Sequence, residues 1–338
     1  MQDRGKPETA TFDVTSMGNA IIDVLWQAPE SVIDAQSLNK GTMTLIDEAR
    51  AEVLTAVMAE DRLMESGGSA GNTAVGLAGL GARSAYVGKV KDDALGQAFK
   101  QSLSRTGVHF EVPFSTDGPA TARSLIFVTP DGQRTMNTFL GASTQLAPRD
   151  IDEALIGGSA VTYMEGYLWD QPEAKDAFRL AADIAHRNGR LTALSLSDPF
   201  CVDRWRAEFL DLIETGTIDI IFANQDELMS LFETRDLDAA RQAVQGANVK
   251  MTALTRGYEG SEVLVPGQDS IPIPVVEVVK RVDTTGAGDL YAAGFLYAFT
   301  QGLDLATCGR YGSRAAAAVI QRVGARLEKD DLAAVTAP

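Results

Sequence analysis

The stretch of the sequence most suited to chemistry is the string Val282-Asp-Thr-Thr-Gly-Ala-Gly-Asp289, which runs directly into an apolar segment typical of a helix. Glycines just before a helix leave backbone N–H groups unshielded, and these groups and the helix dipole together favour an anion. Asp289, in the first turn of that predicted helix, could accept a proton from a hydroxyl beside the anion. Phosphoryl transfer to an alcohol needs such an anion site with an adjacent carboxylate. The alternative is an ordinary glycine turn capped by Asp289.

Two other kinds of phosphate-binding glycine motif are excluded. A dinucleotide-binding Gly-x-Gly-x-x-Gly is not completed after Gly286, because its third position is Tyr291. The Gly88-Lys89 pair is followed by Val90 and lacks the upstream glycine of a P-loop.

A second group of polar residues lies near the N-terminus. Asp23 ends the segment Gly18-Asn-Ala-Ile-Ile-Asp23, and we expect it at the end of the first strand, where open α/β sheets bind ligands. Gly67-Gly-Ser-Ala-Gly-Asn72 opens a predicted helix. Asp23 and Asn72 are an acceptor and a donor suited to adjacent hydroxyls of a sugar. The alternative is that Asp23 and Ser69 only cap local structure.

The elements that must position these residues follow from the hydrophobic pattern. A first strand is predicted over 12–18, and alternating strand and helix patterns fill the chain from residue 151 onward. Such alternation predicts a mostly parallel sheet covered by helices on both faces. The turn-rich segment 20–46 and a hairpin over 121–139 do not fit these units, so we expect them to form a small inserted β flap. The further predicted strands are 84–90, 161–164, 191–196, 218–222 and 250–254, and the predicted helices are 47–60, 69–81, 95–106, 174–188, 205–214, 289–301 and 305–323.

Composition excludes several classes of function. The 338 residues carry 30 basic and 46 acidic side chains, a formal charge of −16, which disfavours nucleic-acid and membrane partners. Two cysteines and two histidines are too few for a disulfide framework or a site built on several imidazoles. The first residues lack the apolar core of a signal peptide, and no apolar run is long enough to cross a membrane. We therefore expect a cytoplasmic protein.

The sequence resembles the ribokinase-like (PfkB) carbohydrate and nucleoside kinases. The string ending at Asp289 is similar to the C-terminal signature of this family, and the segments beginning at Gly67, Leu80 and Tyr86 are similar to its N-terminal signature. The resemblance extends from Phe12 to about Ala325. Within the family, the chain is most similar to adenosine kinases. The segments that carry this likeness are 18–23, 67–69, 131–137, 195–200 and 220–227.

The resemblance implies a three-layer α/β/α ribokinase-like domain over residues 1–338, with a discontinuous β lid from about 20–46 and 112–142. It implies an ATP-dependent kinase that phosphorylates the 5′-hydroxyl of a nucleoside, converting adenosine to AMP. The alternatives are a sugar kinase of the same family, acting on ribose or fructose, and a non-catalytic nucleoside- or sugar-binding protein. The implied partners are small molecules and ATP, in a monomer or a homodimer.

The resemblance also implies roles for individual residues. Asp289 would be the catalytic base, and Glu227 would organise Mg²⁺ through water. A monovalent cation such as K⁺ is a further implied cofactor. The implied anion hole is Gly286, Ala287 and Gly288. The implied acceptor site is Asn19, Asp23, Gly67, Gly68, Ser69, Asn72 and Tyr167. The implied ATP site is Asn224, Thr255, Gly257, Gly260, Arg134 and Thr285.

Each of these roles has a structural alternative. Asn224 and Glu227 are spaced as a capping box, and Arg134 follows a hairpin turn where it could simply be solvated. Thr285 is more typical of the sugar kinases than of the adenosine kinases, whereas Ser313 stands where the sugar kinases commonly carry an asparagine. We expect a helix N-terminus to lower the pKa of Asp289. We also expect surface positions for Lys89, Lys91, His109 and His186, and buried positions for Cys201 and Cys308.

Overall fold

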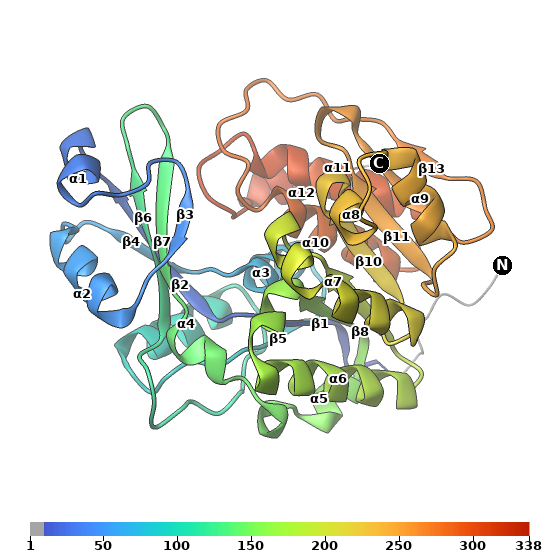
Figure 1. The fold of residues 1–338 in the computed structure, drawn as a ribbon, viewed down its shortest axis with the longest axis horizontal. Coiled ribbons are helices and arrows are strands. Elements are labelled where there is room, and N and C mark those ends of the chain that lie inside the picture. The colour runs from blue at the N-terminus through green and yellow to red at the C-terminus, as the bar shows by residue number, and fades with distance from the viewer. Residues whose placement is uncertain (1–9, 338) are drawn as a thin grey trace.

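The computed structural model describes residues 10–337, which form two β-sheets with their covering helices (Figure 1). Within those residues the larger sheet has eight strands in the order β13-β12-β11-β10-β9-β8-β1-β5. Every pairing from β5 to β11 is parallel, and only β12 and β13 are antiparallel. Its strands are β1 Phe12–Met17, β5 Ser84–Val87, β8 Ser159–Glu165, β9 Leu191–Ser195, β10 Ile220–Asn224, β11 Met251–Thr255, β12 Ser261–Leu264 and β13 Ile271–Ile273.

Helices cover both faces of this sheet, as the strand–helix alternation predicts, because strands buried on both sides need apolar cover above and below. On one face α3, α10 and α11 pack together, and α5 and α6 pack on β8 on the other. The predicted three-layer α/β/α architecture is therefore confirmed. The helices are α1 Glu30–Ala35, α2 Glu48–Val57, α3 Ser69–Gly79, α4 Ala94–Arg105, α5 Glu153–Gly157, α6 Pro172–Arg187, α7 Pro199–Glu214, α8 Gln225–Leu231, α9 Leu237–Gln245, α10 Ala287–Thr300, α11 Leu305–Val319 and α12 Lys329–Thr336.

The smaller sheet stands beside the main body, at the left of Figure 1. Its strand order is β3-β7-β6-β2-β4, and α2 packs on β6 and β7. The segments predicted to form a lid supply four of these strands, but β4 comes from outside them. That the whole chain is one domain with this sheet as its lid stays a proposal. The strands are β2 Ile21–Gln27, β3 Met43–Leu45, β4 Leu63–Ser66, β6 Ala122–Val128 and β7 Arg134–Phe139.

The start of α7 differs from its predicted start at Trp205. The helix begins at Pro199, where proline suits the first helical position and the Asp198 side chain accepts a hydrogen bond from the amide of Cys201. Trp205 itself has a non-helical φ of −122°, and the helix is kinked there. No helix among the described residues is long and apolar enough to span a membrane.

Candidate active site

A cavity of about 620 Å³ lies where the carboxyl ends of the central strands meet the smaller sheet. It is lined by residues at the ends of β8, β9, β10 and β11, by the inner face of the smaller sheet and by the start of α10. This is the edge at which open α/β sheets bind ligands. Of the predicted site residues, the cavity brings together Asn19, Asp23, Gly68, Ser69, Asn72, Tyr167, Asn224, Glu227, Thr255, Thr285, Gly286, Ala287, Gly288 and Asp289.

The loop before α10 has the geometry of an anion-binding turn. Gly286 caps the helix with a φ of 77°, a left-handed conformation that favours glycine. A Cβ at Gly286 would also lie 2.5 Å from the Cβ of Ala325. The amide of Ala287 donates to the carbonyl of Thr284 at 3.2 Å, so it is engaged within the turn. The amides of Gly288 and Asp289 belong to the first helical turn, where helix geometry supplies no partner.

Asp289 is held by two donors from α3. Its Oδ1 accepts a hydrogen bond from Ser69 Oγ at 2.6 Å, and its Oδ2 accepts one from Asn72 Nδ2 at 2.9 Å. These bonds join the two signatures, which lie more than 200 residues apart in the chain. The expected lowering of the Asp289 pKa is wrong. Burial raises that pKa, and the bonds from Ser69 and Asn72 oppose the rise only in part.

Asp23 is placed differently from the prediction. It lies within β2 on the smaller sheet, not at the end of β1, because the chain turns after Met17 and begins a new strand at Ile21. Burial raises the pKa of Asp23 to about 6, although Arg134 and Arg326 lower it. Gly67 packs against this carboxylate so closely that a Cβ would overlap it. Gly67 therefore supports Asp23 from beside the cavity.

Gly68 fixes the start of α3. Its φ is 81°, and a Cβ there would overlap the carbonyl oxygen of Asn19. The glycine pair thus lets α3 begin against the loop that carries Asn19, with Ser69 and Asn72 on the side that faces Asp289.

Glu165 is a site residue that the sequence prediction missed. It ends β8 and is 1% exposed. It accepts hydrogen bonds from the backbone amide and side-chain amide of Asn19 at 2.8 and 2.9 Å, and from the amide of Ala70 at 2.7 Å. Burial raises the pKa of Glu165 to about 7 against these bonds. The sequence feature that could have identified Glu165 is an acidic residue at the end of an otherwise apolar strand.

Asn224 and Glu227 form the capping box that was the alternative to a ligand-binding role. Glu227 N donates to Asn224 Oδ1 at 2.9 Å, and Asn224 N donates to Glu227 Oε2 at 2.9 Å. Asn224 Nδ2 also donates to Glu227 Oε1 at 2.6 Å. Burial raises the pKa of Glu227 to about 7. Both residues line the cavity, so the capping box presents its carboxylate to the cavity as well.

Arg134 is not solvated. Its side chain is 7% exposed, and its Nη1 lies 2.7 Å from Asp283 Oδ2. Asp283 also accepts hydrogen bonds from the amides of Thr285 and Gly324. This ion pair joins β7 of the smaller sheet to the loop before α10. Asp283, which lies in the glycine-containing string, had no predicted role.

Apolar side chains form one wall of the cavity. From the smaller sheet these are Ile21, Met43, Leu45 and Met136, and Leu140 follows directly after β7. Tyr167, in the short 3-10 helix Gly166–Asp170, and Phe200, at the start of α7, also line the cavity, and Phe200 is 76% exposed. Aromatic and apolar walls of this kind suit a planar ring.

Three predicted ATP-site residues are not on the wall of this cavity: Gly257, Gly260 and Arg134. Thr255 ends β11 and lines the cavity, but Gly257 and Gly260 lie in the following turn, outside its lining. Their φ values of 58° and 87° explain both glycines by backbone conformation. Ser313 also lies away from the cavity, in α11, with its Oγ 3.2 Å from that of Ser261.

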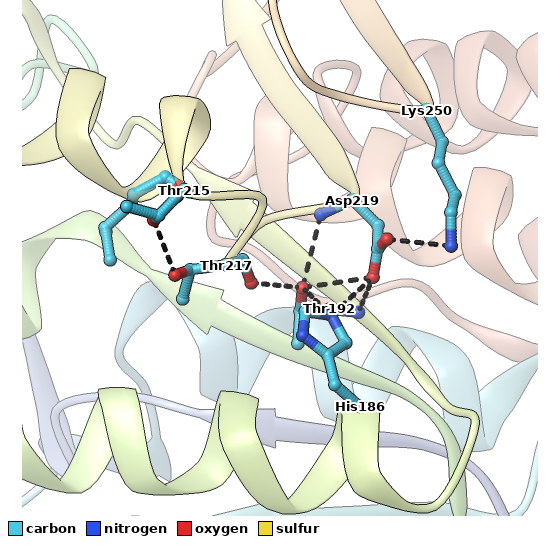
Figure 2. Close-up of polar contacts among 7 residues, drawn as sticks. His186, Thr192, Thr215, Thr217, Asp219 and Lys250 are labelled. Carbon is cyan, nitrogen blue, oxygen red and sulfur yellow. Dashed lines mark hydrogen bonds and ion pairs between the residues drawn. The ribbon is translucent and has the colours of Figure 1, made fainter.

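Some residues expected at the surface have buried partners. Lys89 is 5% exposed and its Nζ lies 2.6 Å from Asp150 Oδ1. Figure 2 shows Asp219 between His186 and Lys250, each 2.9 Å away. These side chains stabilise the structure at the amino ends of β10 and β11. His109 is exposed, and both cysteines are buried as expected.

Comparison with known proteins now decides the family. Residues 43–331 match the family described as pfkB family carbohydrate kinase. The chain belongs to the PfkB family. A PfkB kinase is a phosphotransferase that acts on a hydroxyl group, so the enzyme prediction is confirmed, and the alternative of a non-catalytic binding protein is set aside.

The relatives of this PfkB kinase carry two kinds of name. An adenosine kinase from Sinorhizobium meliloti is 48% identical with a TM-score of 0.87, covering 96% of this chain and 98% of that one. A probable sugar kinase from Rhizobium etli CFN 42 is 44% identical with the same TM-score and coverage. An adenosine kinase from Saccharomyces cerevisiae is 28% identical over 335 residues, covering 93% of this chain and 96% of that one.

Proposed function

We propose that this PfkB kinase transfers the γ-phosphoryl group of ATP to the 5′-hydroxyl of a nucleoside, and that the nucleoside is adenosine. One observation carries the proposal: a single cavity combines the anion loop and Asp289 with Asp23 and an apolar wall. A nucleoside needs all of these at once, because it has a reactive hydroxyl, a ribose diol and a planar apolar base.

In the proposed complex, Asp23 accepts hydrogen bonds from the ribose hydroxyls, and Asn72 adds a donor beside them. Asn19 is fixed for this purpose by Glu165, which accepts from both its amides. Burial raises the pKa values of Asp23 and Glu165, which shows that negative charge is unfavourable in this part of the cavity. A neutral acceptor therefore suits it better than an anionic one. The base lies between the apolar wall and Tyr167.

The chemical step is an in-line displacement. The 5′-oxygen forms a bond to the γ-phosphorus, the bond from that phosphorus to the β–γ bridging oxygen breaks, and ADP leaves. The hydroxyl proton passes to Asp289, which Ser69 and Asn72 hold in place. The amides of the anion loop stabilise charge on the phosphoryl oxygens. The raised pKa of Asp289 makes it a stronger base than the sequence alone indicates.

ATP would lie along the ends of β10 and β11, next to Asn224, Thr255 and Thr285. No group of three or more His, Cys, Asp or Glu side chains within residues 10–337 could hold a metal ion by itself. Glu227 keeps both carboxylate oxygens in its capping box, which fits Mg²⁺ bound mainly by phosphate and water. Mg²⁺ held there would neutralise charge on the phosphates. A monovalent cation stays a prediction.

The second candidate is a sugar kinase, which the name of the Rhizobium etli relative and Thr285 both favour. Ser313, which stands where the sugar kinases commonly carry an asparagine, lies outside the cavity and favours neither acceptor. A free sugar would leave the wall formed by Met43, Leu45 and Phe200 without a partner. The nucleoside therefore uses more of the cavity than a sugar does.

Coupled release of ADP on a panel of acceptors tests the proposal. The panel contains adenosine, inosine, guanosine, ribose and fructose, with a reaction lacking acceptor to measure ATP hydrolysis alone. We expect release with adenosine and identification of the product as AMP by mass spectrometry. Release with a free sugar and none with any nucleoside would establish the sugar kinase instead.

A further inference from the structure

A second cavity, of about 270 Å³, adjoins the first. Asp23 and Asn72 line both cavities, so the second one begins at the proposed ribose site and at a ligand of Asp289. Three arginines line it: Arg134, Arg322 and Arg326. Neither the family match nor the sequence patterns give a role to the last two.

The three arginines differ in whether their charge is already paired. Arg134 is paired with Asp283 at 2.7 Å. Arg322 lies 3.0 Å from Glu328 and 2.7 Å from Asp331. Arg326 uses Nη2 to donate to the carbonyl and hydroxyl oxygens of Ser66, at the end of β4. Its Nη1 is buried and has no hydrogen-bond partner within the described part of the chain.

A buried guanidinium with an unpaired N–H edge lowers the stability of the fold unless a ligand accepts hydrogen bonds from that edge. Burial lowers the pKa of Arg326, while the neighbouring carboxylates of Asp23, Glu65 and Asp289 raise it. Arg326 lines the second cavity together with Asp23 and Asn72, so its guanidinium lies next to the reacting end of the site. Its contact with Ser66 fixes one edge of the group to the smaller sheet, so the other edge is oriented rather than mobile.

We propose that Arg326 binds, through Nη1, the phosphoryl group that passes from ATP to the acceptor. This inference rests on the proposed function, because it requires phosphoryl transfer at Asp289. Arg326 would neutralise charge on the phosphoryl oxygens while the new P–O bond forms, the bond to ADP breaks and the proton moves to Asp289. The contact with β4 makes this arrangement depend on the position of the smaller sheet.

Equilibrium binding of adenosine and of AMP separates this role from a structural one, since the two ligands differ only in the phosphoryl group. Calorimetry on the full chain would compare wild type with Arg326→Met. We expect the affinity for AMP to fall by about tenfold or more, the size of a lost charged hydrogen bond, while the affinity for adenosine stays within about twofold. Turnover should fall by about a hundredfold with little change in the KM for adenosine.

Arg322→Met is the matched control, because it removes an arginine from the same cavity whose charge is already paired. It should leave AMP binding and turnover near wild type. Arg326→Lys should recover part of the affinity for AMP. Equal weakening of adenosine and AMP in Arg326→Met, an unchanged affinity for AMP, or an equal loss in Arg322→Met would each overturn the proposal.

Failure of the proposed function would look different. Wild-type protein would then not bind adenosine at all. The binding of wild type and Arg326→Met would in that case be compared for the acceptor that supports ADP release and for the monophosphate of that acceptor.

Discussion

At the scale of single residues, Asp289 combines two opposing influences. Burial raises its pKa, and hydrogen bonds from Ser69 and Asn72 lower it. The two donors also fix the carboxylate in space, with one oxygen bound to each. Ser69 and Asn72 therefore hold Asp289 in position. When a substrate hydroxyl approaches, a carboxylate oxygen must accept its hydrogen bond in addition to, or in place of, the bond from one of these side chains.

Ser69→Ala removes one of these donors. Because the lost bond lowers the pKa of Asp289, this pKa should rise further in the variant. The acid limb of the profile of kcat/KM against pH should move to higher pH, and kcat/KM below neutral pH should fall by about tenfold, the size of a charged hydrogen bond.

Thr73→Val is the control for that change. Its hydroxyl donates to the backbone carbonyl of Asp289 at 3.2 Å and not to the carboxylate. The acid limb should stay in place in this variant. An equal displacement in both variants would show that general disturbance of α3, and not the bond from Ser69, controls the titration.

The sequence revealed the residues whose signal is local. The glycine string with Asp289 could be interpreted from helix N-terminal chemistry alone. Glu165 and Arg326 could not, because their roles come from contacts with Asn19 and Ser66, which lie 146 and 260 residues away. The pKa of Asp289 was predicted with the wrong sign because the helix dipole is visible in a sequence and burial by distant elements is not.

At the scale of elements, the contact between α3 and α10 brings the two halves of the site together. Gly76 allows this contact, since a Cβ there would lie 2.7 Å from Leu290 Cδ1 and 2.9 Å from Ala293 Cβ. The distance between the helices thus sets the distance from Ser69 and Asn72 to Asp289.

Gly76→Ala should force these helices apart. We expect a loss of about 1–3 kcal/mol of unfolding free energy, typical of overpacking, measured by urea denaturation, together with reduced turnover. Gly71→Ala, on the same helix, is the matched control because its nearest neighbour, Tyr86 Cε2, is 3.9 Å away. Equal stability of the two variants would contradict the role of Gly76.

Long periodic elements were predicted well and short ones poorly. The hairpin β6–β7 has the predicted strands, because alternation and an Asp-Gly turn define it. The missed elements include β4, α1, α5, α9 and α12. β4 has only four residues and includes Glu65 and Ser66, so its pairing with β2 is decided by tertiary contact. The smaller sheet therefore contains a strand that no local pattern indicated.

At the scale of the whole molecule, the charge of −16 coexists with a site that concentrates buried acids. Burial raises the pKa of Asp23 to about 6 and those of Glu165 and Glu227 to about 7. Anion binding in the proposed function uses backbone amides, a helix dipole and arginines, so it does not depend on the net charge. The acidic surface still disfavours nucleic acid as a partner.

These raised values predict how stability depends on pH. Between about pH 4.5 and pH 7 the folded protein keeps protons on Glu165 and Glu227 that the unfolded chain has released, so stability falls as the pH rises through this window. The Tm of the ligand-free protein should therefore be higher at pH 6 than at pH 8. Asp219 and Asp283, whose pKa values are lowered, act in the opposite direction only at lower pH.

Glu165→Gln isolates this effect from the general decrease in surface repulsion. The slope of Tm against pH should be smaller in the variant than in wild type, whatever the absolute Tm. Glu173→Gln, which changes an exposed acid by the same charge, should keep the wild-type slope. Identical slopes in all three proteins would contradict the assigned burial of Glu165.

The central claim is that Asp289, at the start of α10, accepts the proton of the nucleoside hydroxyl during phosphoryl transfer. Asp289→Asn tests it most directly, because asparagine keeps the size of the side chain and removes the base. We measure ADP release with adenosine and, separately, the binding of adenosine. The account predicts that kcat falls by about a thousandfold or more while the Kd for adenosine stays within about threefold. Turnover close to that of wild type would contradict it.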